Sequence, residues 1–147
     1  MLAAKLDNEL CFALYSASNH ITSIYRPLLE PLGLTYTQFI VLMALWEKDD
    51  ISISKLAETV GLSKATMTPL LKRLEQKSLI QRKVLPDNER QKSIVLTAAG
   101  RALSQQSADI TKQAFCATGL TRAQADELIA LCRLVVGKQG DGAVKDQ

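Results

Sequence analysis

Apolar residues recur every three or four positions through most of the chain, and short polar stretches separate these runs. Such spacing places the apolar side chains on one face of a helix and predicts amphipathic helices. The first predicted helix covers residues 7–29 and ends before Pro31 and Gly33. Further helices are predicted over residues 35–46, 52–60, 63–77, 98–115 and 121–136.

Two short β-strands interrupt this helical pattern at residues 80–84 and 93–96, and the polar residues 85–92 join them as a hairpin. The predicted fold class is therefore mainly α with a small β-hairpin wing. A chain of 147 residues has the usual length of one domain. We predict a single domain over residues 1–136 and a flexible tail over residues 137–147, which contain three glycines and scattered charges.

Residues 51–79 have the pattern of a helix-turn-helix, with the turn at Gly61. The positions predicted to face inward on its two helices are Leu56, Ala57, Val60, Met67, Leu70, Leu71 and Leu74. The opposite face of the second helix is the candidate DNA-binding surface, because small residues let the backbone approach a groove while Thr and Lys contact bases and phosphates. The candidate DNA-binding residues on it are Ser63, Lys64, Ala65, Thr66, Thr68, Pro69, Lys72 and Arg73.

Pro69 falls inside that second helix, where a proline loses a hydrogen bond and costs about 3 kcal/mol. On the DNA-facing side its ring could pack on a thymine methyl group. The alternative is a kinked surface helix without a role in recognition. The hairpin that follows favours the DNA interpretation, since a helix in the major groove and a wing in the minor groove form one mode of docking.

The hairpin tip contains the candidate wing contacts Asn88 and Arg90, because a long cation can enter the narrow, electronegative minor groove. Positive charge is concentrated in the same region. Residues 52–101 contain ten Lys or Arg and four acidic residues, a net charge of +6 within a chain total of +3. Concentrated positive charge is typical of a module that binds DNA. Charge alone leaves a solvated surface with chance clustering equally open.

Three cysteines, Cys11, Cys116 and Cys132, lie far apart without a CxxC pair, and His20 is the single histidine. No metal site or other cofactor is therefore expected. No apolar run has the length of a membrane span, and the N-terminus lacks the features of a signal peptide. We expect a cytoplasmic protein with reduced thiols and no membrane partner.

Several motifs resemble the MarR family of transcriptional regulators. They are residues 62–75 (LSKATMTPLLKRLE), 87–90 (DNER) and 96–100 (LTAAG). Residues 6–15 (LDNELCFALY), with residues 34–36 and 41–46, are similar to the branch of this family that senses organic hydroperoxides. The resemblance implies a winged helix-turn-helix over about 35–97 and dimerisation helices over about 7–29 and 98–136. One departure is the wing tip, where the branch often has Asp-Glu-Arg and this chain has Asn-Glu-Arg at residues 88–90.

The resemblance implies a repressor that binds a near-palindromic double-stranded DNA operator as a homodimer and is released by an organic hydroperoxide. The redox-sensing cysteine of that branch, which peroxide oxidises to sulfenic acid, corresponds to Cys11. Two tyrosines around it correspond to Tyr25 and Tyr36. Members with two cysteines form a disulfide with a second cysteine near the C-terminal helices, and Cys116 matches it by position. Cys132 lies with apolar neighbours on its helix and is predicted to be a core residue.

Spacing adds a constraint on this sensor. Tyr25 follows Cys11 by fourteen residues, which is about 21 Å along a straight helix, and Tyr36 lies beyond the end of that helix. If both tyrosines surround Cys11, they come from the other subunit of a two-fold dimer. Tyr15, four residues after Cys11, can lie beside it within one chain and completes the candidate sensor pocket.

Three alternatives to a thiol sensor are open. A lone cysteine in an amphipathic helix is often a small buried hydrophobe. A MarR-type repressor released by a non-oxidising phenolic or lipid-like ligand needs no reactive thiol. A thiol enzyme such as a peroxidase has no support beyond Cys11, since no paired acids or glycine-rich phosphate loop accompany it, so an enzyme is not expected.

Overall fold

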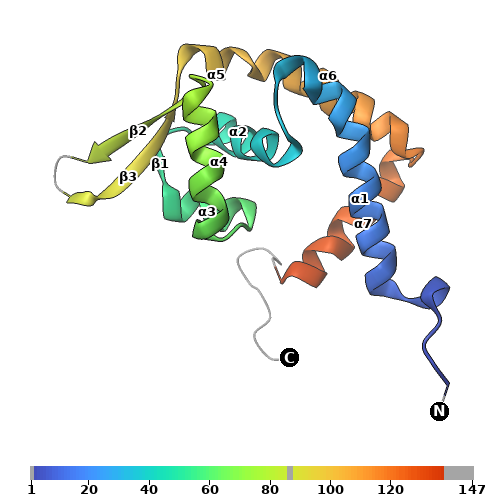
Figure 1. The fold of residues 1–147 in the computed structure, drawn as a ribbon. Helices are drawn as coiled ribbons and strands as arrows, with labels where there is room; N and C mark the ends of the chain where they lie inside the picture. Colours follow the sequence, from blue (N-terminus) through green and yellow to red (C-terminus); the bar gives the residue numbers. More distant parts are fainter. Residues whose placement is uncertain (1, 86–87, 138–147) are drawn as a thin grey trace. The chain divides into compact units, whose positions relative to one another are not determined.

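The computed structural model describes residues 2–85 and 88–137, with the side chains of residues 85 and 88–91 left out of the description. The chain divides into two compact units, Met1–Ala114 and Phe115–Gln147. Figure 1 shows the helices and the small sheet along the sequence. The predicted tail lies outside the described residues, except for Gly137.

Helix α1 (Leu10–Leu29) begins three residues later than predicted. Residues Leu6–Asn8 form the short 3-10 helix η1, and Glu9 has extended backbone angles, so Glu9 and not Asp7 precedes the first turn of α1. The predicted end of this helix is confirmed. A second 3-10 helix, η2 (Glu30–Leu32), follows at once, and Gly33 closes it with a φ of 68°, which favours glycine.

Helix α2 (Tyr36–Glu47) starts at the predicted capping box. The Gln38 N–H donates to the Thr35 hydroxyl at 3.2 Å, and the Thr35 N–H donates to Gln38 Oε1 at 3.1 Å. Helices α3 (Ile53–Val60) and α4 (Lys64–Gln76) follow, each capped by a serine side chain. Gly61 turns the chain between them with a φ of 73°. The predicted helix-turn-helix is confirmed.

The sheet has three antiparallel strands in the order β1-β3-β2. Strand β1 (Ile51–Ser52) was not predicted, because two residues are too short to show an alternating pattern. Strands β2 (Ile80–Leu85) and β3 (Asn88–Leu96) form the wing, which is longer than predicted. Lys92 pairs with Val84 and Asn88 with Leu85, across an irregularity in the register, although the polar composition of residues 85–92 suggested a loop. Pairing through backbone hydrogen bonds needs no apolar side chains, so composition did not reveal it.

The core of the N-terminal unit lies among α2, α3, α4 and the sheet. Its fully buried residues include Phe39, Leu42, Leu45, Leu56, Met67, Leu71, Leu74 and Ile94. The inward stripe predicted for α4 is therefore confirmed. After the wing, Gly100 packs so closely that a Cβ there would lie 2.1 Å from the Leu79 carbonyl oxygen. Only glycine fits at this position without a backbone shift.

The predicted helix over residues 98–115 is two helices, α5 (Ala98–Ala102) and α6 (Ser104–Thr118). The chain stays in a helical conformation at Leu103, so periodicity does not reveal the break. In the C-terminal unit, a capping box of Thr121 and Gln124 starts α7 (Arg122–Val136), as predicted. Among the described residues, no single helix has both the length and the apolar character to cross a membrane, and one sharply bent pair, Leu10–Leu32 with Tyr36–Glu47, meets that test only jointly.

The described residues are mostly helical with a small antiparallel sheet, and the hairpin of β2 and β3 extends beyond α2, α3 and α4 (Figure 1). This is a winged helix-turn-helix, which confirms the predicted fold class.

Candidate nucleic-acid interface and cysteine site

Helix α4 separates its buried and exposed residues cleanly. Met67, Leu71 and Leu74 are completely buried, and Leu70 nearly so. The candidate DNA-binding residues on α4 are all exposed: Ser63, Lys64, Ala65, Thr66, Thr68, Pro69, Lys72 and Arg73. All eight residues are thus accessible to a partner, seven of them on α4 and Ser63 just before it. A helix with this side free has the shape that fits a major groove.

Local hydrogen bonds and a proline determine which groups the first turns of α4 expose. The Ser63 side chain accepts the Thr66 N–H at 3.2 Å, and the Thr68 hydroxyl donates to the Lys64 carbonyl at 3.0 Å. Pro69 lies inside α4 without ending it, and its lack of an N–H removes the usual bond to the Ala65 carbonyl. The exposed ring adds an apolar contact to a face whose other members are small, hydroxyl-bearing or positively charged.

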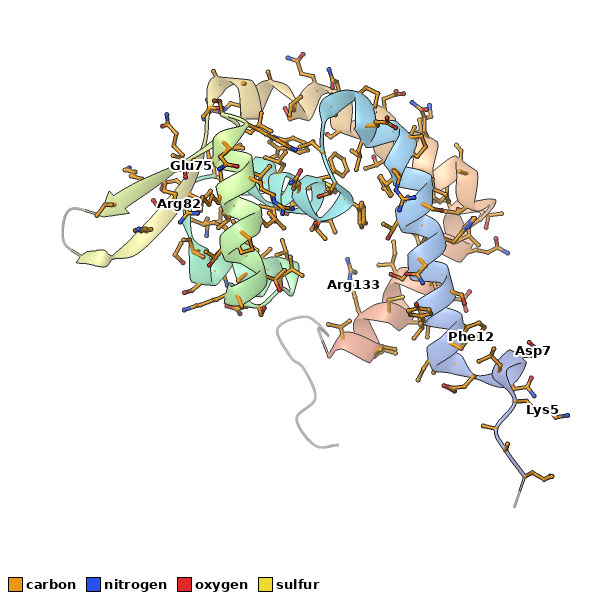
Figure 2. All side chains as sticks on the ribbon, viewed as in Figure 1. Lys5, Asp7, Phe12, Glu75, Arg82 and Arg133 are labelled. Carbon is orange, nitrogen blue, oxygen red and sulfur yellow. The ribbon has the colours of Figure 1, made fainter. Side chains whose placement is uncertain are left out.

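The wing is attached to α4 by an ion pair across the unit. Figure 2 shows Arg82 of β2 beside Glu75 of α4, and Arg82 Nε lies 3.5 Å from Glu75 Oε1. The side chains of Asn88 and Arg90 lie outside the described residues, so their contact with DNA stays a prediction.

The structure narrows the interpretation of the positive charge between residues 52 and 101. At least five of the ten cations there have partners within the chain. The ion pairs are Lys55–Glu58, Arg82–Glu75, Lys83–Asp50 and Arg101–Asp49, and Lys77 donates to the Gly33 carbonyl and to Gln38 Oε1. These cations are engaged within the chain. In the part of the chain that the structure describes, Lys64, Lys72 and Arg73 form no ion pair, so α4 presents the positive charge that is available to a polyanion.

Sequence reasoning missed two residues that organise this region. Lys77 links the end of α4 to Gln38 of the capping box, at 3.1 Å between Nζ and Oε1. Asp49 accepts the Leu96 N–H at 2.9 Å at the base of the wing. The partners of these contacts are far apart along the chain, so no local spacing predicts them. The two adjacent acids Asp49 and Asp50, beside a basic hairpin, are the one available signal.

Cys11 is the second residue of α1, and its side chain is exposed. Cys11 therefore lies in the first turn of a helix, and a helix start is a favourable place for an anion. The apolar neighbours Leu10 and Phe12 are also exposed, and Figure 2 shows Phe12 on the first turns of α1. Tyr15, one turn after Cys11, is 65% exposed. The interpretation of Cys11 as a buried hydrophobe does not describe the single chain.

Tyr25 of α1 and Tyr36 of α2 form a tilted ring contact, with 36° between the ring planes. Their ring centroids are 4.5 Å apart, and Tyr25 also contacts Phe39 at 5.9 Å. Burial raises the pKa of both phenols above the ordinary value of 10.0, and Tyr36 raises the pKa of Tyr25 further. Because α1 is one continuous helix through Cys11 and Tyr25, this pair lies about 21 Å along the helix axis from the thiol of its own chain.

The other two cysteines lie in the C-terminal unit. Cys116 is exposed in the last turn of α6, which continues three residues beyond the predicted helix end at residue 115. Cys132 on α7 is partly buried, while Leu128 and Val135 of the same stripe are 41% and 64% exposed. The prediction that Cys132 is a core residue is therefore wrong for the described residues of the single chain, which leave Cys132 only partly buried and its neighbours exposed. Among the described residues, no group of three His, Cys, Asp or Glu side chains could hold a metal ion.

Comparison with known proteins agrees with this arrangement. The MarR family profile matches residues 34–92. The chain is 43% identical to the organic hydroperoxide resistance transcriptional regulator of Bacillus subtilis (strain 168) over 72% of each chain. It is 36% identical to the HTH-type transcriptional regulator SarZ of Staphylococcus epidermidis over 95% of each chain.

Solved structures of AbfR of Staphylococcus epidermidis are also similar. Reduced AbfR bound to DNA matches with a TM-score of 0.74 and 31% identity, over 89% of this chain and 90% of AbfR. Disulfide-formed AbfR matches with a TM-score of 0.63 and 30% identity, over 89% of this chain and 92% of AbfR.

Proposed function

Since the chain belongs to the MarR family of transcriptional regulators, we propose that it is a cytoplasmic repressor that releases its DNA operator when an organic hydroperoxide oxidises Cys11. Helix α4 enters the major groove through its exposed face. The wing reaches the adjacent minor groove, with Asn88 and Arg90 as its contacts. Reduced AbfR, which shares this fold at 31% identity, is bound to DNA in its structure and supports this half of the proposal.

The DNA-binding form is a homodimer. Exposed apolar side chains gather on α7, where Leu131, Leu134 and Val135 are 51%, 53% and 64% exposed. Leu10 at the start of α1 is 65% exposed as well. Monomers rarely leave such apolar surface uncovered, and a two-fold dimer covers the same residues of both chains at once. In this arrangement residues 1–136 act as one domain, with the helices before residue 35 and after residue 97 forming the dimer interface.

A two-fold dimer also sets the form of the operator. The two α4 helices of a dimer lie about one helical turn of DNA apart, roughly 34 Å, and read two half-sites in opposite directions. The operator is therefore near-palindromic. The positive charges of Lys64, Lys72 and Arg73 occur twice on one duplex, which strengthens the salt-dependent part of binding.

The ring contact of Tyr25 with Tyr36, at 4.5 Å between centroids, is the single observation that best supports the sensor. Two phenols held together by burial and by ring contact form a preorganised pair of hydrogen-bond donors. Burial raises their pKa, so both stay protonated at neutral pH and are able to donate to a thiolate. They lie a helix length away from Cys11 of the same chain, so the thiol that they surround belongs to the partner subunit.

The chemistry takes two balanced steps. The Cys11 thiolate sulfur attacks the terminal oxygen of the hydroperoxide and the O–O bond breaks, which gives a sulfenic acid and an alkoxide; the alkoxide takes a proton from water and leaves as the alcohol. A second thiol then attacks the sulfenic sulfur, which gives a disulfide and releases water. We assign that thiol to Cys116 of the partner subunit, with a mixed disulfide to a small thiol as the other route. The new bond turns the two DNA-binding heads out of register.

A DNA mobility shift beside a non-reducing gel tests this proposal. The probe is a duplex selected from random-sequence DNA by the reduced protein, and the titrant is cumene hydroperoxide. The wild-type protein is expected to lose DNA as a covalent dimer appears. Cys11→Ser keeps its DNA affinity and ignores the peroxide, whereas the control Cys132→Ser behaves as wild type.

Cys116→Ser separates the two routes, because it removes the covalent dimer while leaving the oxidation of Cys11. Wild-type DNA binding that ignores peroxide would contradict the sensor and keep the DNA-binding regulator. Release from DNA by a phenolic or lipid-like compound, without dependence on any thiol, would then identify a ligand-responsive repressor.

A further inference from the structure

The wing joins the body of the N-terminal unit at the start of β2 and the end of β3 (Figure 1). Strand β1 supports β3 through only two paired residues, Ile51 with Ile94 and Ser52 with Ser93. Beyond these pairs, in the described part of the hairpin, β2 and β3 pair only with each other. The direction in which the wing points is therefore set by contacts at its base.

Asp49 lies in the turn after α2 and contacts both the end of β3 and helix α5. Its Oδ1 accepts the N–H of Leu96, the last residue of β3, at 2.9 Å, and the Asp50 N–H at 2.8 Å. Its Oδ2 accepts from the Arg101 guanidinium of α5 at 3.2 Å. Desolvation by partial burial raises the pKa of Asp49, but the two N–H groups and Arg101 outweigh it, so the pKa lies below the ordinary 3.8. The carboxylate is thus charged at neutral pH.

Two neighbouring ion pairs are weaker supports of the same hairpin. Asp50 lies 3.6 Å from Lys83 of β2, and Glu75 lies 3.5 Å from Arg82. Partly exposed ion pairs of this length contribute about 0–1 kcal/mol each, because solvent screens them and long side chains lose entropy. A carboxylate that accepts backbone N–H groups and a guanidinium together makes stronger, charge-assisted bonds. Asp49 is therefore the strongest of these acidic contacts.

Helix α5, which Asp49 contacts through Arg101, is itself tightly packed. The Trp46 indole N–H, one turn earlier in α2, donates to the Gly100 carbonyl of α5 at 2.9 Å. Gly100 in turn rests against the backbone of Leu79, just before β2. The end of α2 thus holds both the end of the wing and the start of α5, the helix that leads toward the C-terminal unit.

We propose that Asp49 is a positioning residue for DNA binding, which holds the base of the wing and the start of α5 in the orientation that lets the wing reach the DNA flanking α4. This inference rests on the proposed function, because the wing must contact DNA. Asp49 itself touches no DNA. Its effect reaches the duplex through Leu96 and the hairpin that ends there.

Two duplexes of different length test this role with the full-length protein. One is the full site selected from random-sequence DNA, and the other is the same site shortened at both ends to remove the flanks that the wing contacts. Wild-type protein is expected to bind the short duplex more weakly. Asp49→Ala is expected to lose about tenfold in affinity for the full duplex and almost nothing further on shortening.

Two variants complete the design. Asp49→Asn keeps an oxygen acceptor for the Leu96 N–H while losing the charge that faces Arg101. Its loss of affinity for the full duplex is therefore expected to be smaller than that of Asp49→Ala, and shortening the duplex is expected to weaken its binding less than that of the wild-type protein. Glu47→Ala removes one negative charge from the exposed end of α2 and is expected to behave as wild type on both duplexes. Thermal unfolding of each variant checks that it is folded, and Asp49→Asn decides the test if Asp49→Ala does not fold.

A loss of equal size on both duplexes shows a merely structural role and overturns the inference. So does an Asp49 variant that binds like Glu47→Ala. If the reduced wild-type protein selects no duplex from random-sequence DNA, the proposed function is overturned and, with it, this role of Asp49. Wild-type binding that is weakened by shortening, together with unaffected Asp49 variants, overturns the positioning role alone.

Discussion

Helices α4 and α7 begin alike and are covered very differently. Each starts at a hydroxyl side chain that accepts an N–H three residues on, Ser63 for α4 and Thr121 for α7, and each has an apolar stripe. In α4 the stripe is buried, with Leu71 completely inaccessible. In α7 the equivalent residues are exposed, and Leu134 is 53% accessible. An apolar stripe thus shows that a helix packs against something, but not whether that partner lies in the same chain.

The largest expected effect is on the α4 side of this comparison. Leu71→Ala removes buried methyl groups from the centre of the core and is expected to lower the free energy of unfolding by about 2–5 kcal/mol. Urea unfolding measures this loss when it is followed by the fluorescence of Trp46, the single tryptophan of the chain, which lies in the same N-terminal unit as Leu71. A cost below 1 kcal/mol, on the order of a surface substitution, would show that the core around α4 is loose.

A substitution on the exposed stripe of α7 is expected to weaken dimerisation and not folding. Leu134→Glu places a charge on the exposed apolar stripe and is expected to raise the dissociation constant of the dimer at least about tenfold, or about 1.4 kcal/mol. Sedimentation equilibrium measures the change, with the neighbouring Arg133→Gln as a control of similar exposure. A variant that stays as dimeric as the control would remove the stripe from the interface.

A smaller effect should be the same in both helices. Ser63→Ala and Thr121→Ala each remove a side-chain acceptor from an N-terminus and are expected to cost about 1 kcal/mol of stability. Circular dichroism during urea unfolding measures the loss, and replacement by Asp should restore most of it in each helix. A cost confined to α4 would mean that capping depends on burial of the helix, and would weaken the view that the two helices start by the same local rule.

The smallest effect concerns the tyrosine pair at alkaline pH. Burial raises the pKa of Tyr25 and Tyr36 above 10.0, so the stability that they contribute is complete below pH 10 and is lost as the pH rises through the folded-state pKa. The free energy of unfolding, followed through Trp46, should therefore fall on the alkaline side. Tyr36→Phe, which cannot ionise, is expected to flatten this decline, and an unchanged slope would mean that the pair is solvated.

Local features were predictable because they depend on neighbours in the sequence. The capping box at Thr35, the turn at Gly61 and the buried stripe of α4 all follow from residues within one or two turns of each other. The exposed DNA-facing side of α4 follows from the same periodicity. Cys11 and the tyrosines, by contrast, came from resemblance to a family, because no spacing alone distinguishes a reactive cysteine from a small apolar residue.

Other features could not be predicted because their partners are distant in the sequence. The bond from the Leu96 N–H to Asp49 spans 47 residues, and the bond from Lys77 to Gln38 spans 39. Strand β1 exists only because β3 passes beside it. Four of the ten cations that suggested DNA binding proved to form ion pairs within the chain, which a count of charges does not reveal.

The sequence by itself determined the capped starts of α2, α3, α4 and α7, which faces are apolar and which family the chain resembles, since these depend on caps, glycines and periodicity. Tertiary structure alone decided that, among the described residues, the stripe of α4 is covered while that of α7 is not, and that the ring of Tyr25 contacts that of Tyr36. The physical reason is that burial is a property of neighbours in space. An apolar face lowers the free energy only when another surface excludes water from it, and the sequence does not say which surface that is.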